Sequence, residues 1–274
     1  AVVEVRVDRY PVGQLPSQGH VARSLAVNAG PEADLDLLIT KHGLRERPAA
    51  PRATLKSPES KDREDLTALP TFLLQPWSSA EAPILPAVSL ESSETGHKLW
   101  VHAPAVAERL GFAGALDLHL RDQAEALCLG RKWIPLLPAN LTKAAAFKAG
   151  SAEAALSVVL ELSPEGDLQH YPFCRSTIKP DGLVDAKALT ALAERKPKAR
   201  TTPAALKALK DQLPLLEQLI ALAEVLRQKR LASGSIDLDL AMPAIEGLGD
   251  LAVPEPDESR QGWLVQLDPA TEPA

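Results

Sequence analysis

The groups that could do acid–base or metal chemistry are unevenly spread along this chain. Between Asp65 and Glu91 the only acidic residue is Glu81, and two prolines, Pro83 and Pro86, lie in the same stretch, TFLLQPWSSAEAPILPAVSLE. A divalent cation such as Mg²⁺ takes oxygen ligands, and a catalytic metal pair needs several carboxylates close together. This stretch therefore lacks the acidic residues that a metal site would require.

Four other polar residues are candidates, and each has a simpler structural interpretation. Asp117, His119 and Asp122 fall within one segment of helical spacing, where they are better explained as an acid at a helix N-terminus and solvated surface groups than as a metal cluster. His102 lies in the apolar string WVHAPAV, and we interpret it as a buried, hydrogen-bonded core histidine. A functional role for His102 is the alternative.

The nucleophilic side chains are not arranged for covalent catalysis. Ser89 and Ser157 have no His and Asp set beside them in the sequence, so a hydrolytic triad is not supported. The cysteines, Cys128 and Cys174, show no metal-type spacing, and we expect free thiols in a reducing compartment. The glycines do not follow the order of a phosphate-binding loop.

One basic run, RKPKAR, contains Arg195, Lys196, Lys198 and Arg200. We interpret it as a solvated loop between two helices, with a contact to nucleic acid or to an acidic partner as the alternative. The chain as a whole is acidic, with 30 Lys and Arg against 36 Asp and Glu and a net charge of −6. This balance argues against a uniformly basic nucleic-acid surface but allows a local one.

The bulk composition indicates a folded protein with an aliphatic core. The chain has 274 residues, of which 45% are hydrophobic and only 4% aromatic. No run approaches the roughly 18 apolar residues that span a bilayer, and the N-terminus lacks the order of a signal peptide. We therefore expect a cytoplasmic protein without membrane contact.

The elements that must position these groups form four segments. Residues 1–44 alternate as two strands and then show helical spacing up to Gly43. Residues 45–65 are charged, rich in proline and interpreted as a linker. Residues 66–250 read first as short strands with a hairpin bend at Gly166, then as helices, and residues 251–274 as an acidic tail containing proline.

The helical part begins with DAKALTALAER and continues after the basic run. Thr202 and Pro203 predict an N-cap and first helical position, and leucines mark one face from Leu206 to Leu226. Pro214 lies inside this pattern and should kink or restart the helix. The string SGSIDLDLAMP then returns to strand alternation.

Six strings, taken in order, resemble the catalytic domain of the ribonuclease II and R (RNB) family of 3′-to-5′ exoribonucleases. They are DREDLTALPTF (62–72), LWVHAPAV (99–106), GALD (114–117), WIPLLPANL (133–141), AALSVVLELSPEGDL (154–168) and RLASGSIDLDL (230–240). The resemblance implies an α+β fold: a partial RNB-like domain with a mixed sheet and flanking helices. Residues 1–44 resemble the end of an OB or cold-shock domain and a connector.

The resemblance also locates the family's metal site. Members hold divalent metal with four Asp residues, and these positions fall here on Gln75, Pro83, Leu85 and Pro86. None of these side chains is a carboxylate, so we expect neither catalytic nor metal-binding residues at this place and no cofactor.

Other family positions are also changed. An Asp falls on Ala105, an aromatic that stacks on RNA on Cys128, a stacking tyrosine on Asp185 and an arginine on Glu153. Stacking contributes about 1–3 kcal/mol per base, so these changes remove binding as well as catalysis. The remaining candidates for contact with single-stranded RNA are His102 and the basic run at Arg195, Lys196, Lys198 and Arg200.

We therefore expect a catalytically degenerate member that acts through RNA binding or as a protein scaffold. The alternative is a Mg²⁺-dependent 3′-to-5′ exoribonuclease acting on single-stranded RNA, its site completed by a partner chain. A third possibility is one half of a split protein, whose partner supplies the C-terminal half of the domain. In that case the helix from Leu206 to Leu226 should expose an apolar face for docking.

Overall fold

The structure is a computed structural model of the chain, and it divides into two compact units. It describes residues 2–27, 29–44, 48–77, 79, 81–129, 132–195, 199 and 201–236, together with the strands 242–245 and 265–268. The first unit comprises residues 1–49, 128–132 and 241–269, and the second comprises residues 50–127, 133–240 and 270–274. Each unit is described by itself.

The first unit contains the predicted hairpin and helix. Strands β1 (Val2–Arg9) and β2 (Gln18–Leu25) pair antiparallel, and helix α1 (Pro31–Lys41) follows and ends beside Gly43, as predicted. Arg23 links them, since its side chain donates to Glu4 at 2.5 Å and to Asp36 at 2.8 Å. Strands β13 (Met242–Ile245) and β14 (Val265–Asp268) also pair antiparallel. The predicted strand SGSIDLDLAMP lies largely outside the described residues.

The second unit is built on one mixed sheet. Its strands are β3 (Glu64–Asp65), β4 (Thr71–Gln75), β5 (Ala87–Ser93), β6 (Gly96–Pro104), β9 (Glu153–Leu162), β10 (Leu168–His170), β11 (Phe173–Ile178) and β12 (Gly182–Asp185). The order is β12-β4-β5-β6-β9-β11-β3, with β10 paired to β9. The pairs β12–β4 and β11–β3 are parallel, and the others are antiparallel. The mixed α+β fold that the resemblance implied is confirmed.

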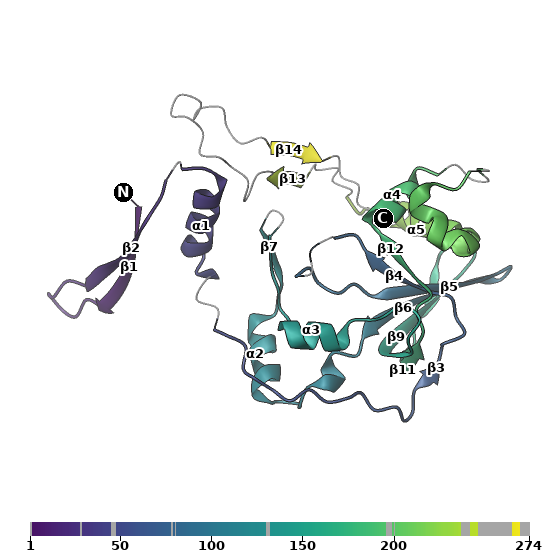
Figure 1. Ribbon diagram of the computed structural model, residues 1–274, viewed down its shortest axis with the longest axis horizontal. Coiled ribbons are helices and arrows are strands. Elements are labelled where there is room, and N and C mark those ends of the chain that lie inside the picture. Colours follow the sequence, from purple (N-terminus) through teal and green to yellow (C-terminus); the bar gives the residue numbers. More distant parts are fainter. Residues whose placement is uncertain are drawn as a thin grey trace. The chain divides into compact units, whose positions relative to one another are not determined.

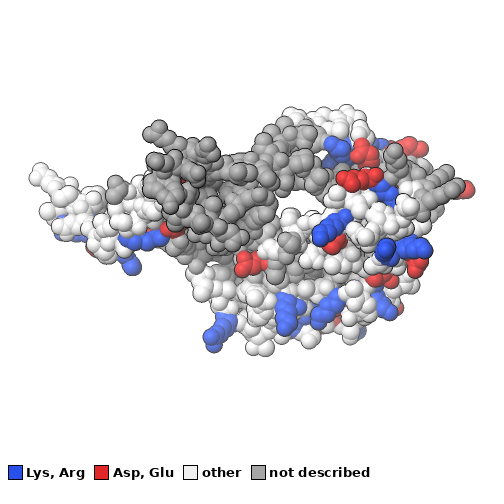
Figure 2. Space-filling model, turned by 45° about the horizontal axis from the view of Figure 1, so that its top comes forward, with Lys and Arg blue, Asp and Glu red and all other residues white. Residues whose placement is uncertain are grey.

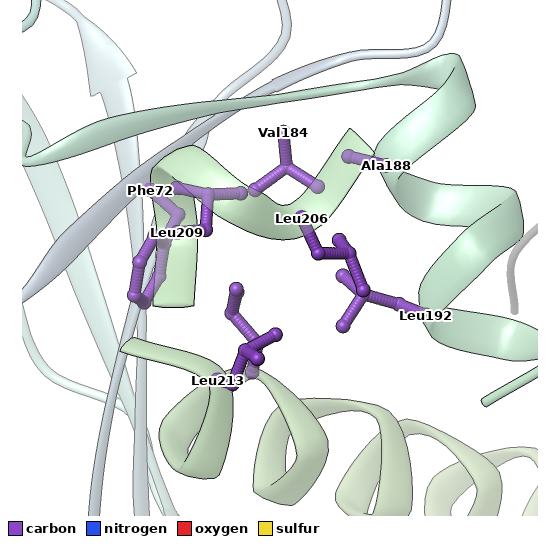
Figure 3. Close-up of a cluster of buried hydrophobic side chains, with 8 residues drawn as sticks. Phe72, Val184, Ala188, Leu192, Leu206, Leu209 and Leu213 are labelled. Atoms are coloured by element: carbon purple, nitrogen blue, oxygen red, sulfur yellow. The ribbon is translucent and has the colours of Figure 1, made fainter. Parts of the chain in front are cut away.

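Helices cover the β12 end of this sheet (Figure 1). They are α4 (Ala186–Ala193), the 3₁₀ helix η3 (Ala204–Gln212) and α5 (Leu213–Ala232). Figure 3 shows their side chains meeting those of the sheet in one cluster: Phe72, Val184, Ala188, Leu192, Leu206, Leu209 and Leu213. Each large apolar side chain that is fully buried contributes about 1.5–3 kcal/mol, so this cluster fixes the helices on the sheet.

The start of the helical region differs from the prediction. Pro203 precedes the first helical residue, no side chain caps that end, and the first segment is 3₁₀ rather than α. The helix restarts at Leu213 with Pro214 in its first turn, as predicted. The reason is that Pro214 has no backbone N–H for the carbonyl four residues earlier, so a continuous α-helix cannot run through it.

The apolar face expected between Leu206 and Leu226 is mostly covered. Most of its leucines pack in the two clusters under η3 and α5, and Ile220 and Val225 are the exposed large apolar residues of this stretch, at 37% and 38%. A continuous docking face for a missing half is therefore not present on the described part of these helices.

A smaller group of elements lies away from α4 and α5 (Figure 1). It contains the 3₁₀ helix η2 (Ala107–Arg109), α2 (Ala115–Gln123) and α3 (Ala139–Ala145). Leu116, Leu120 and Leu141 form its buried core. The short strands β7 (Leu127–Leu129) and β8 (Lys132–Ile134) pair separately.

Candidate functional site: the β4–β5 connection

The positions assigned to the metal ligands lie at the end of β4 and in the connection to β5. Gln75 is the last residue of β4, is exposed, and lies opposite Asp185 of β12 in a parallel pair. Pro83 is exposed, whereas Leu85 and Pro86 are half-buried just before β5. The local arrangement therefore presents one neutral amide and three apolar side chains.

Glu81 is the carboxylate of this connection. Its backbone N–H donates to Ser79 Oγ at 3.2 Å, which makes a tight local turn, and its side chain is exposed. Within the described ranges, no three His, Cys, Asp or Glu side chains are close enough together to hold a metal ion. On the face shown in Figure 2, the blue Lys and Arg side chains lie among the red Asp and Glu side chains.

Two tryptophans meet beside this connection. The rings of Trp77 and Trp133 are 5.2 Å apart between centroids and inclined by 60°, a tilted contact that aromatic rings favour. Trp77 follows Gln75 by two residues, and Trp133 comes from β8. The pair ties the β4–β5 connection to β8, so the connection is held by apolar contact.

A hydrogen-bonded network of four buried hydroxyls and one imidazole extends across five strands of the sheet. Thr71 Oγ1 lies 2.8 Å from Ser89 Oγ, which lies 3.1 Å from His102 Nε2. On the other side His102 Nδ1 lies 2.6 Å from Ser157 Oγ, and Ser157 Oγ lies 2.5 Å from Ser176 Oγ. Residue spacing could not reveal that Ser89 and Ser157 both contact His102, because the three residues come from different strands.

This hydrogen-bonded network is part of the buried core. All five side chains are fully buried, and no carboxylate takes part in it. Burial lowers the pKa of His102 from 6.5 to about 4, so the imidazole is neutral near pH 7. The core-histidine interpretation is confirmed, and His102 has no surface with which an RNA could make contact in this fold.

The basic run is described only in part. Lys196, Lys198 and Arg200 lie outside the described residues. The Arg195 side chain is largely buried and donates to Glu217 at 2.8 Å and to two backbone carbonyls, those of Thr201 and Ala199, at 2.5 and 2.7 Å. Arg195 therefore fixes the loop to α5.

Two arginines and one carboxylate form a cluster that sequence reasoning missed. The Arg63 side chain is almost fully buried, pairs with Glu108, and donates to the carbonyl oxygens of Glu59, Ala155 and Ser176. Arg175 lies 3.2 Å from the same carboxylate. Burial raises the pKa of Glu108, but its bonds to Arg63 and Arg175 outweigh this and lower it. The cluster anchors residues 59–63 to β9 and β11.

The other positions singled out by the resemblance have structural roles or none. Asp185 is the N-cap of α4, accepting a hydrogen bond from Ala188 N at 2.8 Å. Ala105 is buried, Glu153 is half-buried at the start of β9, and Cys128 is exposed. No disulfide joins Cys128 to Cys174.

Asp117 is also structural. It lies in the first turn of α2, as predicted, and accepts hydrogen bonds from Arg121 and from Ala113 N, which lower its pKa. His119 and Asp122 are half-buried and exposed on the same helix. In the described part of the chain, no helix is long and apolar enough to cross a lipid bilayer.

These features define the class of protein. The family model of the RNB domain matches residues 63–261, and the chain therefore belongs to the RNB family. The chain is 27% identical over 283 residues to the acetazolamide conferring resistance protein zam of Synechocystis sp., an alignment that covers 96% of this chain and 33% of that protein. The chain thus spans about a third of the length of this relative.

Solved structures agree on the fold. The apo form of Mycoplasma genitalium RNase R superposes with a TM-score of 0.65 at 16% identity, covering 89% of this chain and 38% of that one. Yeast Ssd1, described as a pseudonuclease, superposes with a TM-score of 0.62 at 17% identity, covering 83% of this chain and 28% of that one. The resemblance read from the six strings is confirmed at the level of family and fold.

Proposed function

We propose that this chain is a non-catalytic RNB-family protein that acts in the cytoplasm by binding, with single-stranded RNA as its ligand or a protein as its partner. The observation that carries the proposal is the β4–β5 connection. The four positions where the family's metal-binding Asp residues are expected hold Gln75, Pro83, Leu85 and Pro86. A metal pair needs clustered anionic oxygens to offset its charge, and these side chains offer one neutral oxygen.

The packing of the connection supports the same conclusion. The contact between Trp77 and Trp133 holds the connection by apolar packing, and two prolines restrict the backbone without offering side-chain ligands. The likeness in fold to Ssd1, a pseudonuclease by description, fits a chain of this kind. The structures of Mycoplasma genitalium RNase R include complexes with double-stranded RNA and with ribose-methylated single-stranded RNA, which supports RNA as the ligand to test first.

The alternative is a Mg²⁺-dependent 3′-to-5′ exoribonuclease whose site is completed by a partner chain. One observation favours it: Gln75 and Glu81 are both exposed, so ligands from a second chain could approach them. A single added carboxylate would not suffice, since one acid cannot replace four. We therefore expect Gln75→Asp to gain no Mg²⁺-dependent activity.

The test is a nuclease assay on 5′-labelled single-stranded RNA with Mg²⁺ or Mn²⁺, beside a binding assay with metal chelated. We expect no shortening of the RNA and metal-independent binding. RNase R serves as the active control. Processive shortening that requires metal and is lost in Glu81→Gln would overturn the proposal, whereas shortening that survives this substitution and chelation indicates a contaminating nuclease. Absence of both shortening and binding would favour the protein-scaffold form.

A further inference from the structure

A single aromatic ring, Phe112, is presented at the surface just before α2. Its side chain is 88% exposed. Isolated exposed apolar residues are normal on protein surfaces, so exposure alone indicates nothing. The geometry that holds the ring is what distinguishes Phe112 from the other exposed apolar side chains.

The backbone turn that follows Phe112 is strained at Ala113 and is stabilised by a hydrogen bond. Ala113 has a φ of +56°, a left-handed conformation that is unfavourable for a residue with a Cβ atom. Asp117 stabilises it by accepting a hydrogen bond from Ala113 N at 2.9 Å. Backbone strain of this kind persists only where surrounding contacts impose it, and it is concentrated at functional positions.

The same carboxylate positions a cation over the ring. Arg121 Nε donates to the two oxygens of Asp117 at 3.1 and 3.2 Å, and the guanidinium carbon lies 5.4 Å from the centroid of the Phe112 ring. The Arg121 side chain is nevertheless 61% exposed. Asp117 therefore stabilises the turn at Ala113 and holds the Arg121 side chain, and through both it orients the Phe112 ring.

This arrangement has the two groups that single-stranded RNA requires. One face of the Phe112 ring lies under the guanidinium, and the high exposure of the side chain leaves the rest of its surface open for a stacked base. The terminal nitrogens of Arg121 have no hydrogen-bond partner among the residues that the structure places, so they are available to a phosphate.

We propose that Phe112 and Arg121 form a contact for one unpaired base and its phosphate in single-stranded RNA. The proposal rests on the proposed RNA-binding function and places a binding surface outside the β4–β5 connection. It also explains how a chain of net charge −6 could bind RNA without a broad basic face, because stacking supplies part of the affinity.

The experiment measures the affinity of the full chain for a fluorescently labelled single-stranded RNA with metal chelated. Phe112→Ala should weaken binding by about 5- to 100-fold, the usual effect of removing one stacking side chain. The matched control is Phe173→Ala, because Phe173 on β11 is also a phenylalanine with 65% of its surface exposed, and none of the arginines that the structure describes lies over its ring. Both variants should fold, since both rings are largely exposed.

A second measurement tests the cation. Arg121→Gln should lower the slope of log affinity against log salt concentration by about 0.7, which corresponds to one lost phosphate contact. Arg121→Lys should retain most of this slope because it keeps the charge.

The outcomes separate this inference from the proposed function. Equal affinity of Phe112→Ala and the wild type, when the wild type binds RNA, would overturn the inference alone. Equal loss in the Phe112 and Phe173 variants would overturn it too, by showing a non-specific effect. No binding by the wild type refutes RNA as ligand, and self-association that depends on Phe112 would then assign the ring to a protein contact.

Discussion

Protonation of His102 should couple the stability of this sheet to pH, and substitution of His102 should remove that coupling. The imidazole is fully buried between Ser89 and Ser157, and burial lowers its pKa from 6.5 to about 4. Between these values the unfolded chain binds a proton that the folded chain does not. Stability is therefore fully present above pH about 6.5 and is lost progressively as pH falls toward about 4.

The magnitude follows from the gap between the two pKa values. At about 1.36 kcal/mol for each pH unit, protonation costs about 3 kcal/mol once pH falls below the folded-state value. At pH about 4.5 the loss should already be about 2.5 kcal/mol. This is a large fraction of the free energy of unfolding of an ordinary domain, about 5–15 kcal/mol.

The assay is urea unfolding of the wild type and His102→Gln at several pH values between about 7.5 and 4.5. The variant should be less stable at pH 7.5 by about 1–3 kcal/mol, because a buried hydrogen-bonded group is replaced. The difference should then shrink by about 2.5 kcal/mol toward pH 4.5, since only the wild type carries the linked proton. Carboxylates such as Glu108 titrate in both proteins and cancel.

The control is His97→Gln, on the same strand β6. His97 contacts Ser92 at 2.9 Å near the surface, so this variant measures what the substitution of a histidine outside the core does to the same stability curves. Parallel stability curves for the wild type and His102→Gln would refute the reasoning, because they would show that His102 binds its proton equally in the folded and unfolded chains.

Three further predictions concern the packing that positions the site. Arg63→Ala should lower the free energy of unfolding by about 3–5 kcal/mol, because it breaks a buried ion pair and removes the donors to three carbonyl oxygens. As a control, Arg52 is exposed, so Arg52→Ala should change this free energy by less than about 0.5 kcal/mol. Equal effects of the two substitutions in urea unfolding would contradict the anchoring role of Arg63. Asp185→Ala should lower the free energy of unfolding by about 1 kcal/mol because α4 loses its N-cap, whereas Asp185→Asn should change it little because Asn is also a good N-cap. Similar unfolding midpoints for the two variants would argue against a capping role of Asp185. Leu206→Ala should lower the free energy of unfolding, measured by thermal unfolding, by about 2–5 kcal/mol, because the side chain is fully buried in the cluster of Figure 3. A loss below about 1 kcal/mol would mean that this cluster does not hold η3.

Local patterns predicted most strands and helices correctly, because each depends on neighbours in the sequence. The alternation of residues 2–9 and 18–25 indicated the β1–β2 hairpin, and Pro214 marked the start of α5. Gly166 was predicted at a bend and has a φ of +81°. The structure gives a second reason for glycine at position 166, because a Cβ atom there would lie only 2.9 Å from the Val225 side chain on α5.

Errors arose where tertiary contacts decide the outcome. The sequence pattern placed an α-helix cap at Thr202, but a 3₁₀ segment forms instead and packs Leu206 and Leu209 against the sheet. Sequence reasoning also missed that Glu217 and two backbone carbonyls accept hydrogen bonds from Arg195, whose role as a candidate for RNA contact stays a prediction. Charge and spacing cannot reveal such contacts, because the partners lie elsewhere in the chain.

The sequence by itself predicted the family, which the match to the RNB domain model confirms, and most of the strand and helix segments. The placement of four expected carboxylate positions on Gln75, Pro83, Leu85 and Pro86 stays a prediction from the resemblance. Residue type alone decides whether a side chain can be an anionic ligand. Only the tertiary structure decided that His102 is a neutral core group and that Asp117 holds Phe112 and Arg121 together through the turn at Ala113. These properties depend on burial and on distances between side chains, which the order of strands in the sheet and the packing of the helices fix.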